Sequence, residues 1–256
     1  MSTRQSGLNE RHIVAYLSPF SMNCLGLRNP WATAWWSAAC PGLGHLMLCK
    51  YILGTFLIGW EVFINNKSGI NASIYYSMLG DFDRAKDALD LHWFYLYMGI
   101  YVFTIWDSYY RAVLYNESYL LACKTGCNVR SVNMNSLEIN ILNKRKPSNL
   151  LIWSLFAPGT GYLHVNRLPT AVMFAIWVVA IICCSSMLPA IHATMLGDFE
   201  GAKRLDVQWL LYFPSLYTFI AYDCYALGKE QNKLFRTDQA AYLRRAYRSG
   251  KFIMPI

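Results

Sequence analysis

Charged side chains are scarce in this sequence. Asp, Glu, Lys and Arg make up 15% of its 256 residues, whereas apolar residues make up 55%. In soluble globular proteins about one quarter of the residues are charged. So few ionisable groups cannot cover a water-facing surface for a chain of this length, which argues against a soluble globular protein. We therefore expect the lipid bilayer to be the solvent, and the first partner, of much of the chain.

The sequence also lacks the patterns of a secreted leader, a disulfide framework and a zinc site. Residues 1–29 contain no continuous apolar core followed by a small-residue cleavage site, so we expect the first membrane segment to act as the insertion signal. The eight cysteines form no C-x-x-C pair. Cys123 and Cys127 form one C-x3-C, without the second pair of ligands that a structural zinc site needs. We expect reduced thiols, and neither a metal nor a cofactor.

The chain repeats itself at an offset of 117 residues. The clearest evidence is two phrases that occur twice, MLGDF at 78–82 and 195–199, and PGxG at 41–44 and 158–161. One deletion near residue 205 changes the offset to 116. We infer a tandem duplication. The chain then divides into an N-terminal tail, a first repeat, a linker, a second repeat and a basic C-terminal tail, at 1–28, 29–115, 116–145, 146–232 and 233–256.

Each repeat has the same order of segments. It begins with an apolar segment that is too short to span a hydrocarbon core, which needs about 20 residues. A Pro-Gly-x-Gly turn follows, because proline removes a helix donor and glycine permits turn dihedrals. Its residues are Pro41, Gly42 and Gly44 in the first repeat, and Pro158, Gly159 and Gly161 in the second. An apolar helix, the LGDF phrase and a closing aromatic helix complete the repeat, at 51–64 and 92–110, then at 170–188 and 208–227.

The predicted fold class is an all-α integral membrane protein with two tandem parallel repeats and about four crossings. In each repeat the short first segment, at 30–50 and 147–167, is either re-entrant or interfacial, and the sequence leaves both alternatives open. With this topology, eighteen of the 23 Lys and Arg residues lie on the side of the two tails and the linker. Positive residues are retained in the cytoplasm, so we expect cytoplasmic tails and external LGDF loops, in the plasma membrane of a bacterium.

The net charge of +8 alone would fit either a nucleic acid or an anionic membrane face. Because the basic residues are spread along one membrane face, we predict no nucleic-acid partner. Residues 235–252 interleave Arg and Lys with aromatic residues. This favours a C-terminal tail that lies as a helix against anionic lipid over an RNA-binding tail.

The motifs PGLGH and PGTGY, each opening an apolar helix, resemble the two-transmembrane-hairpin domain family. In that family a Pro/Gly-rich turn precedes the first helix and an acidic residue closes the second. Asp107 and Asp223 stand here at the position of that acid. The family's short Asp-Arg-aromatic motif is not matched, and the insert between the helices is longer than a tight hairpin. The resemblance implies a hairpin architecture and no particular reaction. The duplicated whole looks like a multi-pass protein of bacterial membranes.

The candidate functional residues are polar side chains within the two repeats. They are Glu61, His45, Tyr162, His164, Asp81, Asp198, Asp107, Asp223, Lys50 and Arg167. Glu61 lies inside an apolar helix, where an ionisable group is costly and marks a proton or cation site. The alternative is a Glu near the interface, since Asn65 and Asn66 follow it. The equivalent residue of the second repeat is Val178, which weakens a symmetric transport mechanism.

The other candidates occur at matching positions of the two repeats. His45 and Tyr162 follow the turn, where their side chains would cap turn carbonyls, whereas a metal or proton relay would use His45 and His164. Gly before Asp81 or Asp198 indicates a helix stop followed by an N-cap, and the alternative is a pair of facing carboxylates that bind a cation or substrate.

Two further acids close the repeats. Asp107 and Asp223 lie where they oppose the helix dipole, so a compensating partner is expected. We predict that Lys50 lies near Asp107 and that Arg167 lies near Asp223.

The sequence contains no nucleophile–base pair and no metal motif, so an enzyme is the least favoured function. The leading hypothesis is a structural or assembly protein that docks other membrane proteins. The alternative is a small transporter or channel with its site at the repeat interface, as in other proteins built from repeats.

Overall fold

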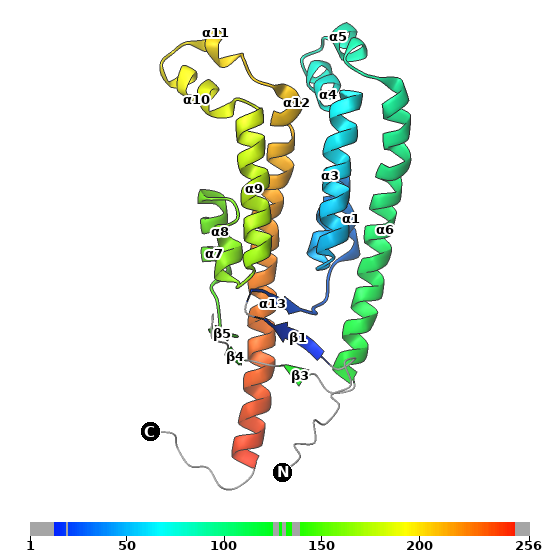
Figure 1. Ribbon diagram of the computed structural model, residues 1–256. Coiled ribbons are helices and arrows are strands. Elements are labelled where there is room, and N and C mark those ends of the chain that lie inside the picture. The colour runs from blue at the N-terminus through cyan, green and yellow to red at the C-terminus, as the bar shows by residue number, and fades with distance from the viewer. Residues whose placement is uncertain (1–12, 19, 125–127, 130–131, 135–138, 249–256) are drawn as a thin grey trace. The chain divides into compact units, whose positions relative to one another are not determined.

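The computed structural model describes residues 13–18, 20–124, 128–129, 132–134 and 139–248, and it is mostly helical (Figure 1). Its contacts divide the chain into two units. The helical unit comprises residues 28–115 and 172–221, and the sheet-containing unit comprises residues 1–27, 116–171 and 222–256. Three helices contribute residues to both units: α6 (Leu91–Lys124), α9 (Leu168–Cys184) and α13 (Tyr212–Arg248). The helical character predicted from the sequence is confirmed.

The helical unit contains short helices as well as long ones. From the first repeat come α1 (Pro30–Ala39), α2 (Leu43–Met47), α3 (Tyr51–Ser68), α4 (Ile70–Met78), α5 (Phe82–Asp87) and part of α6. From the second come most of α9, then α10 (Met187–Met195), α11 (Phe199–Ala202), α12 (Val207–Leu210) and the start of α13. α4 and α10 were not predicted, because the expected apolar helices ended at residues 64 and 188 and no helix was assigned between those ends and the LGDF phrases.

The sheet-containing unit holds strands that the all-α prediction did not include. Its three-stranded sheet has the order β2-β1-β3, from β1 (Ile13–Leu17), β2 (Met22–Cys24) and β3 (Asn128–Val129). β1 is antiparallel to β2 and parallel to β3. A separate hairpin joins β4 (Val132–Met134) to β5 (Ile139–Ile141), and α7 (Pro147–Phe156) and α8 (Thr160–His164) follow. Ala15, Leu17, Met22, Cys24, Ala122, Leu142 and Leu234 form its buried apolar cluster.

The duplication extends to the backbone turns. Four pairs of residues, each 117 positions apart, adopt left-handed dihedrals at the same points of the two repeats. They are Gly42 with Gly159, Cys49 with Asn166, Gly69 with Ser186, and Gly80 with Gly197. A left-handed residue that is not glycine costs roughly 1–2 kcal/mol. The turns are therefore retained even where their side chains differ.

The Pro-Gly-x-Gly turn has the conformation that the sequence predicts. Gly42 has a φ of 103° and Gly159 a φ of 99°, a region that side chains other than hydrogen rarely allow. Each turn separates two short helices, α1 from α2 and α7 from α8. A Cβ atom on Gly44 would collide with the Thr33 carbonyl oxygen and the Ser37 Oγ, so glycine lets α1 and α2 approach closely.

The length and hydropathy of the helices bear on the predicted membrane crossings. Within the described residues, no single helix is both long and apolar enough to cross a membrane. Taken together, α9 and α10 are long and apolar enough, with a bend of 59° between the two helices. The predicted number of crossings, and the choice between re-entrant and interfacial segments, remain predictions.

Candidate functional site

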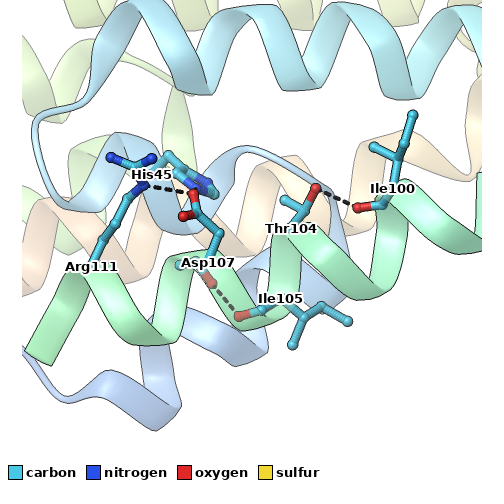
Figure 2. Close-up of polar contacts among 7 residues, drawn as sticks. His45, Ile100, Thr104, Ile105, Asp107 and Arg111 are labelled. Carbon is cyan, nitrogen blue, oxygen red and sulfur yellow. Dashed lines mark hydrogen bonds and ion pairs between the residues drawn. The ribbon is translucent and has the colours of Figure 1, made fainter.

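A buried ion-pair cluster joins α2 to α6 in the helical unit. The His45 Nε2 atom lies 2.9 Å from Oδ2 of Asp107, and Arg111, one turn further along α6, places its Nε 2.6 Å from the same oxygen. His45 is fully buried and Asp107 is 6% exposed. Figure 2 shows both basic side chains pointing toward the Asp107 carboxylate. The acid is thus held by cationic or polar partners from two helices.

Two hydroxyl groups near this cluster do not take part in it. Thr104 donates a hydrogen bond to the carbonyl oxygen of Ile100 at 2.7 Å, and Ser108 donates to that of Ile105 at 2.9 Å (Figure 2). Both buried hydroxyls are satisfied by the backbone of α6 itself. The cluster therefore consists of the histidine, the carboxylate and the guanidinium.

The sheet-containing unit holds the equivalent pair from the second repeat. The Tyr162 hydroxyl donates to Oδ2 of Asp223 at 2.9 Å, and both residues are buried. Tyr162 is 117 positions after His45, and Asp223 is 116 positions after Asp107, which matches the sequence alignment of the repeats. We call these two contacts the repeat latches. Each fastens the helix after the Pro-Gly turn to the closing helix of its own repeat.

Within the described residues, neither acid forms an ion pair with the cation that the sequence predicts for it. Asp107 contacts His45 and Arg111, whereas the Lys50 side chain is exposed. Asp223 contacts Tyr162 and forms no ion pair with Arg167 within the described residues, where the Arg167 Nε donates to the Met22 carbonyl oxygen at 3.0 Å. The error arose because the cations were sought at the membrane edges, while the partners lie one helix turn away and on the short helix after the turn.

The expected roles of the turn residues also change. The His45 and Tyr162 side chains bind carboxylates, so the prediction that they cap turn carbonyls does not describe those contacts. His164 is exposed, and its ring lies 6.1 Å from that of Trp153. Among the residues that the structure describes, no three His, Cys, Asp or Glu side chains form a group that could hold a metal ion.

Glu61 lies in a second buried polar cluster, within the helical unit. It is 5% exposed on α3, and its Oε1 accepts hydrogen bonds from Asn65 Nδ2 at 3.1 Å and from the Tyr97 hydroxyl at 3.3 Å. Its Oε2 accepts no hydrogen bond, and the carboxylate forms no ion pair, within the described residues. The alternative of a solvated Glu near the interface does not fit this burial.

The same cluster caps the first turn of α4. Gly69 precedes α4 and offers no side chain, so distant groups accept from its first N–H groups. Asn65 Oδ1 accepts from the Asn71 N–H at 3.2 Å, and Gln208 Oε1 accepts from the Ala72 N–H at 2.9 Å. Gln208 Nε2 also donates to Asn65 Oδ1 at 2.7 Å. Tyr97, Asn71 and Gln208 were not among the predicted residues, although a buried helix start without its own cap requires acceptors from elsewhere.

This cluster belongs to one repeat only. The positions equivalent to Glu61, Asn65 and Asn71 in the second repeat are Val178, Ile182 and Leu188, all apolar. An acid with one free oxygen and only neutral donors can take up a proton or a small cation. Glu61 is therefore, like Asp223, a buried carboxylate without a charged partner in the described residues.

Asp81 and Asp198 act as helix caps, as the sequence predicts. Asp81 Oδ1 accepts from the Arg84 N–H at 3.2 Å, and Asp198 Oδ1 accepts from the Gly201 N–H at 2.9 Å. Gly80 and Gly197, which precede them, have left-handed dihedrals. Figure 1 shows the helices they cap as separate elements, α5 next to α4 and α11 next to α10, and each aspartate caps its own helix.

Comparisons of the chain with protein-family models, with curated proteins and with solved structures find no match.

Proposed function

We propose that this chain is an integral membrane protein with a structural role, and that it docks other membrane proteins. The observation that carries the proposal is an inverted distribution of side chains in the helical unit. Large apolar groups point outward, with Ile52 at 91%, Phe56 at 64%, Trp106 at 59% and Ile176 at 63% exposed. Polar groups such as Glu61 are buried inside. This distribution suits a lipid solvent, because lipid accepts apolar surface and excludes polar groups.

The way in which the buried polar groups are used supports a docking role. The latch residues His45, Asp107 and Arg111 bind one another, and Tyr162 binds Asp223. These contacts hold helices together. The exposed aromatic residues Phe103, Trp106 and Tyr110 recur along α6 at helical spacing, and the rings of Trp106 and Tyr110 stack at 5.6 Å. Such a stripe offers a packing surface to a helix of another membrane protein.

Photo-crosslinking tests this role. We would place a photoreactive amino acid at Trp106, on the stripe, and in a matched variant at Ile52, an exposed apolar position on α3. The expected result is a discrete protein adduct from position 106 and lipid adducts alone from position 52, in membranes that retain the protein after alkaline carbonate extraction. Extraction of the chain by carbonate, or lipid adducts alone from both positions, would refute the proposal.

The orientation is part of the same proposal. The tails and the linker carry most of the basic residues, which favours cytoplasmic tails and external LGDF loops. In whole cells, a membrane-impermeant thiol reagent should label Arg84→Cys and leave Lys229→Cys unlabelled, against a background without the natural cysteines. Labelling of the second variant alone would reverse the orientation.

Glu61 favours a second candidate, a small proton or cation transporter. Its free carboxylate oxygen and its neutral hydrogen-bond donors leave room for a bound cation or proton. In proteoliposomes, a transporter would show flux that Glu61→Gln abolishes and that the matched change at an exposed acid, Glu117→Gln, retains. Flux equal to that of empty vesicles would remove this candidate and leave the docking role in place.

A further inference from the structure

A basic cavity lies along one face of α13 in the sheet-containing unit. Its volume is about 890 Å³. Most of the lining comes from α13, at 225, 229, 232–233, 236–237, 240–241 and 244, and this spacing of three to four residues defines one face of a helix. Cys123 of α6 and Pro147, the first residue of α7, complete the lining. The cavity is thus built from three helices of the same unit.

The lining of the cavity is cationic. Among the described residues, Lys229, Lys233, Arg236 and Arg244 line it, and no Asp or Glu does. None of these four forms an ion pair within the part of the chain that the structure describes. Lys233 instead places its ammonium group 5.6 Å from the ring of Tyr119. Four cations without a counter-charge create a positive potential that attracts anions into a concave site.

A second, smaller cavity adds to this charge. It has a volume of about 220 Å³ and is lined by Lys144, Arg145 and Lys146, and no carboxylate of the described residues lines it. Asn232, which lines the larger cavity, joins the two sites. Its side chain accepts from the Arg145 N–H at 2.7 Å and donates to the Arg145 carbonyl oxygen at 2.7 Å. These two bonds fix the basic segment 144–146 next to α13.

We propose that the larger cavity binds the phosphate group of an anionic ligand, carried either by a lipid headgroup or by a free phosphate ester. Arginine offers a planar fork of donors that matches phosphate oxygens, and lysine supplies a point charge beside it. Thr237 and Asn232 add polar groups to the lining. This inference stands on the cavity and its charge, and is independent of the proposed docking role.

Direct binding measurements test the inference on the full chain in nanodiscs of phosphatidylcholine. The probes are dihexanoyl phosphatidic acid, sn-glycerol 3-phosphate and inorganic phosphate, measured by isothermal titration calorimetry. Lys233→Gln/Arg236→Gln removes two cavity cations. The matched control Lys67→Gln/Lys86→Gln removes the same charge from exposed positions that line neither cavity.

We expect saturable binding that the cavity variant weakens about tenfold or more, since each basic residue near an anionic headgroup contributes about 1 kcal/mol. The control variant should bind as the unaltered chain does. Binding of the phosphatidic acid alone identifies a lipid ligand, and equal binding of glycerol phosphate identifies a soluble ester. Either result supports the site.

Three results would overturn the inference. One is the absence of saturable binding by the unaltered chain. Another is an equal loss of affinity in the two variants, which would mean that net charge alone attracts the probes. The third is a short RNA oligonucleotide binding more tightly than any phosphate probe, which would mark the face as a nucleic-acid surface. The first and third tests use the unaltered chain, so they stand even if a variant fails to fold.

Discussion

Removal of one hydroxyl group, by Tyr162→Phe, should destabilise the sheet-containing unit. The change keeps the aromatic ring, which is fully buried, and deletes the donor that lies 2.9 Å from Oδ2 of Asp223. Asp223 is 3% exposed, and its Oδ1 already has no hydrogen-bond partner in the described residues. A hydrogen bond to a charged group contributes about 1.5–3 kcal/mol, and its loss leaves a buried carboxylate unsatisfied. We expect the free energy of unfolding to fall by about 2–3 kcal/mol.

The matched control is Tyr95→Phe, which deletes the hydroxyl of a tyrosine that is 71% exposed. A surface change of this kind should alter the free energy of unfolding by less than about 0.5 kcal/mol. Reversible unfolding in mixed detergent micelles, followed by tryptophan fluorescence, measures both variants. The double variant Tyr162→Phe/Asp223→Leu should recover part of the loss relative to Tyr162→Phe alone, because replacing both partners leaves no unsatisfied buried group.

Two outcomes would refute this reasoning. If Tyr162→Phe costs no more than Tyr95→Phe, the hydroxyl does not stabilise Asp223. If the double variant is as unstable as the sum of its single changes, the two side chains are not coupled, and the latch is a contact without energetic consequence.

Four further changes test the packing and capping of the helical unit. Gly44→Ala should lower the free energy of unfolding by about 1–3 kcal/mol, because the added Cβ collides with α1. Gly59→Ala places its Cβ where no atom lies within 4 Å, so it should raise the free energy of unfolding by about 0.5–1 kcal/mol. Thermal unfolding of the two variants compares these effects. Gln208→Leu should leave the Ala72 N–H without an acceptor, at a cost of about 1–3 kcal/mol, and amide hydrogen exchange at Ala72 should accelerate. Asp198→Ala should cost about 0.5–2 kcal/mol through the lost cap, seen as faster exchange in α11 alone.

Local features of this fold could be predicted from the sequence. The caps at Asp81 and Asp198, and the helix stops at the preceding glycines, depend on residues within one turn of chain. The Pro-Gly-x-Gly turns are similarly local. The sheet was not predictable in this way, since β1 pairs in parallel with β3 across more than a hundred residues. Short apolar runs such as IVAYL at 13–17 do not specify such a distant partner.

The latches were partly predictable, less so than the local caps and turns and more so than the pairing of β1 with β3. His45 and Asp107 are 62 residues apart, so neighbouring sequence cannot pair them. The internal alignment nevertheless contained the signal, because a hydrogen-bonding ring and an acid occur at matched positions of both repeats. Lys50 and Arg167 are matched in the same way, and physical preference for a cation led the prediction to them. Only the distances in the folded chain show that the acids contact His45 and Tyr162, and that they form no ion pair with Lys50 and Arg167 in the described residues.

The contact between Gln208 and α4 determines the order in which parts of the first repeat can complete their hydrogen bonds during synthesis of the chain. All residues of the first latch and its ion pair precede residue 112, so these contacts can form as soon as the first repeat leaves the ribosome. The Ala72 N–H acquires its acceptor only when Gln208, 136 residues later, has been made. A nascent chain paused in the linker would therefore have a closed first latch and an incompletely capped α4. Synthesis of the first repeat is therefore complete well before every N–H group of its helices has a hydrogen-bond acceptor.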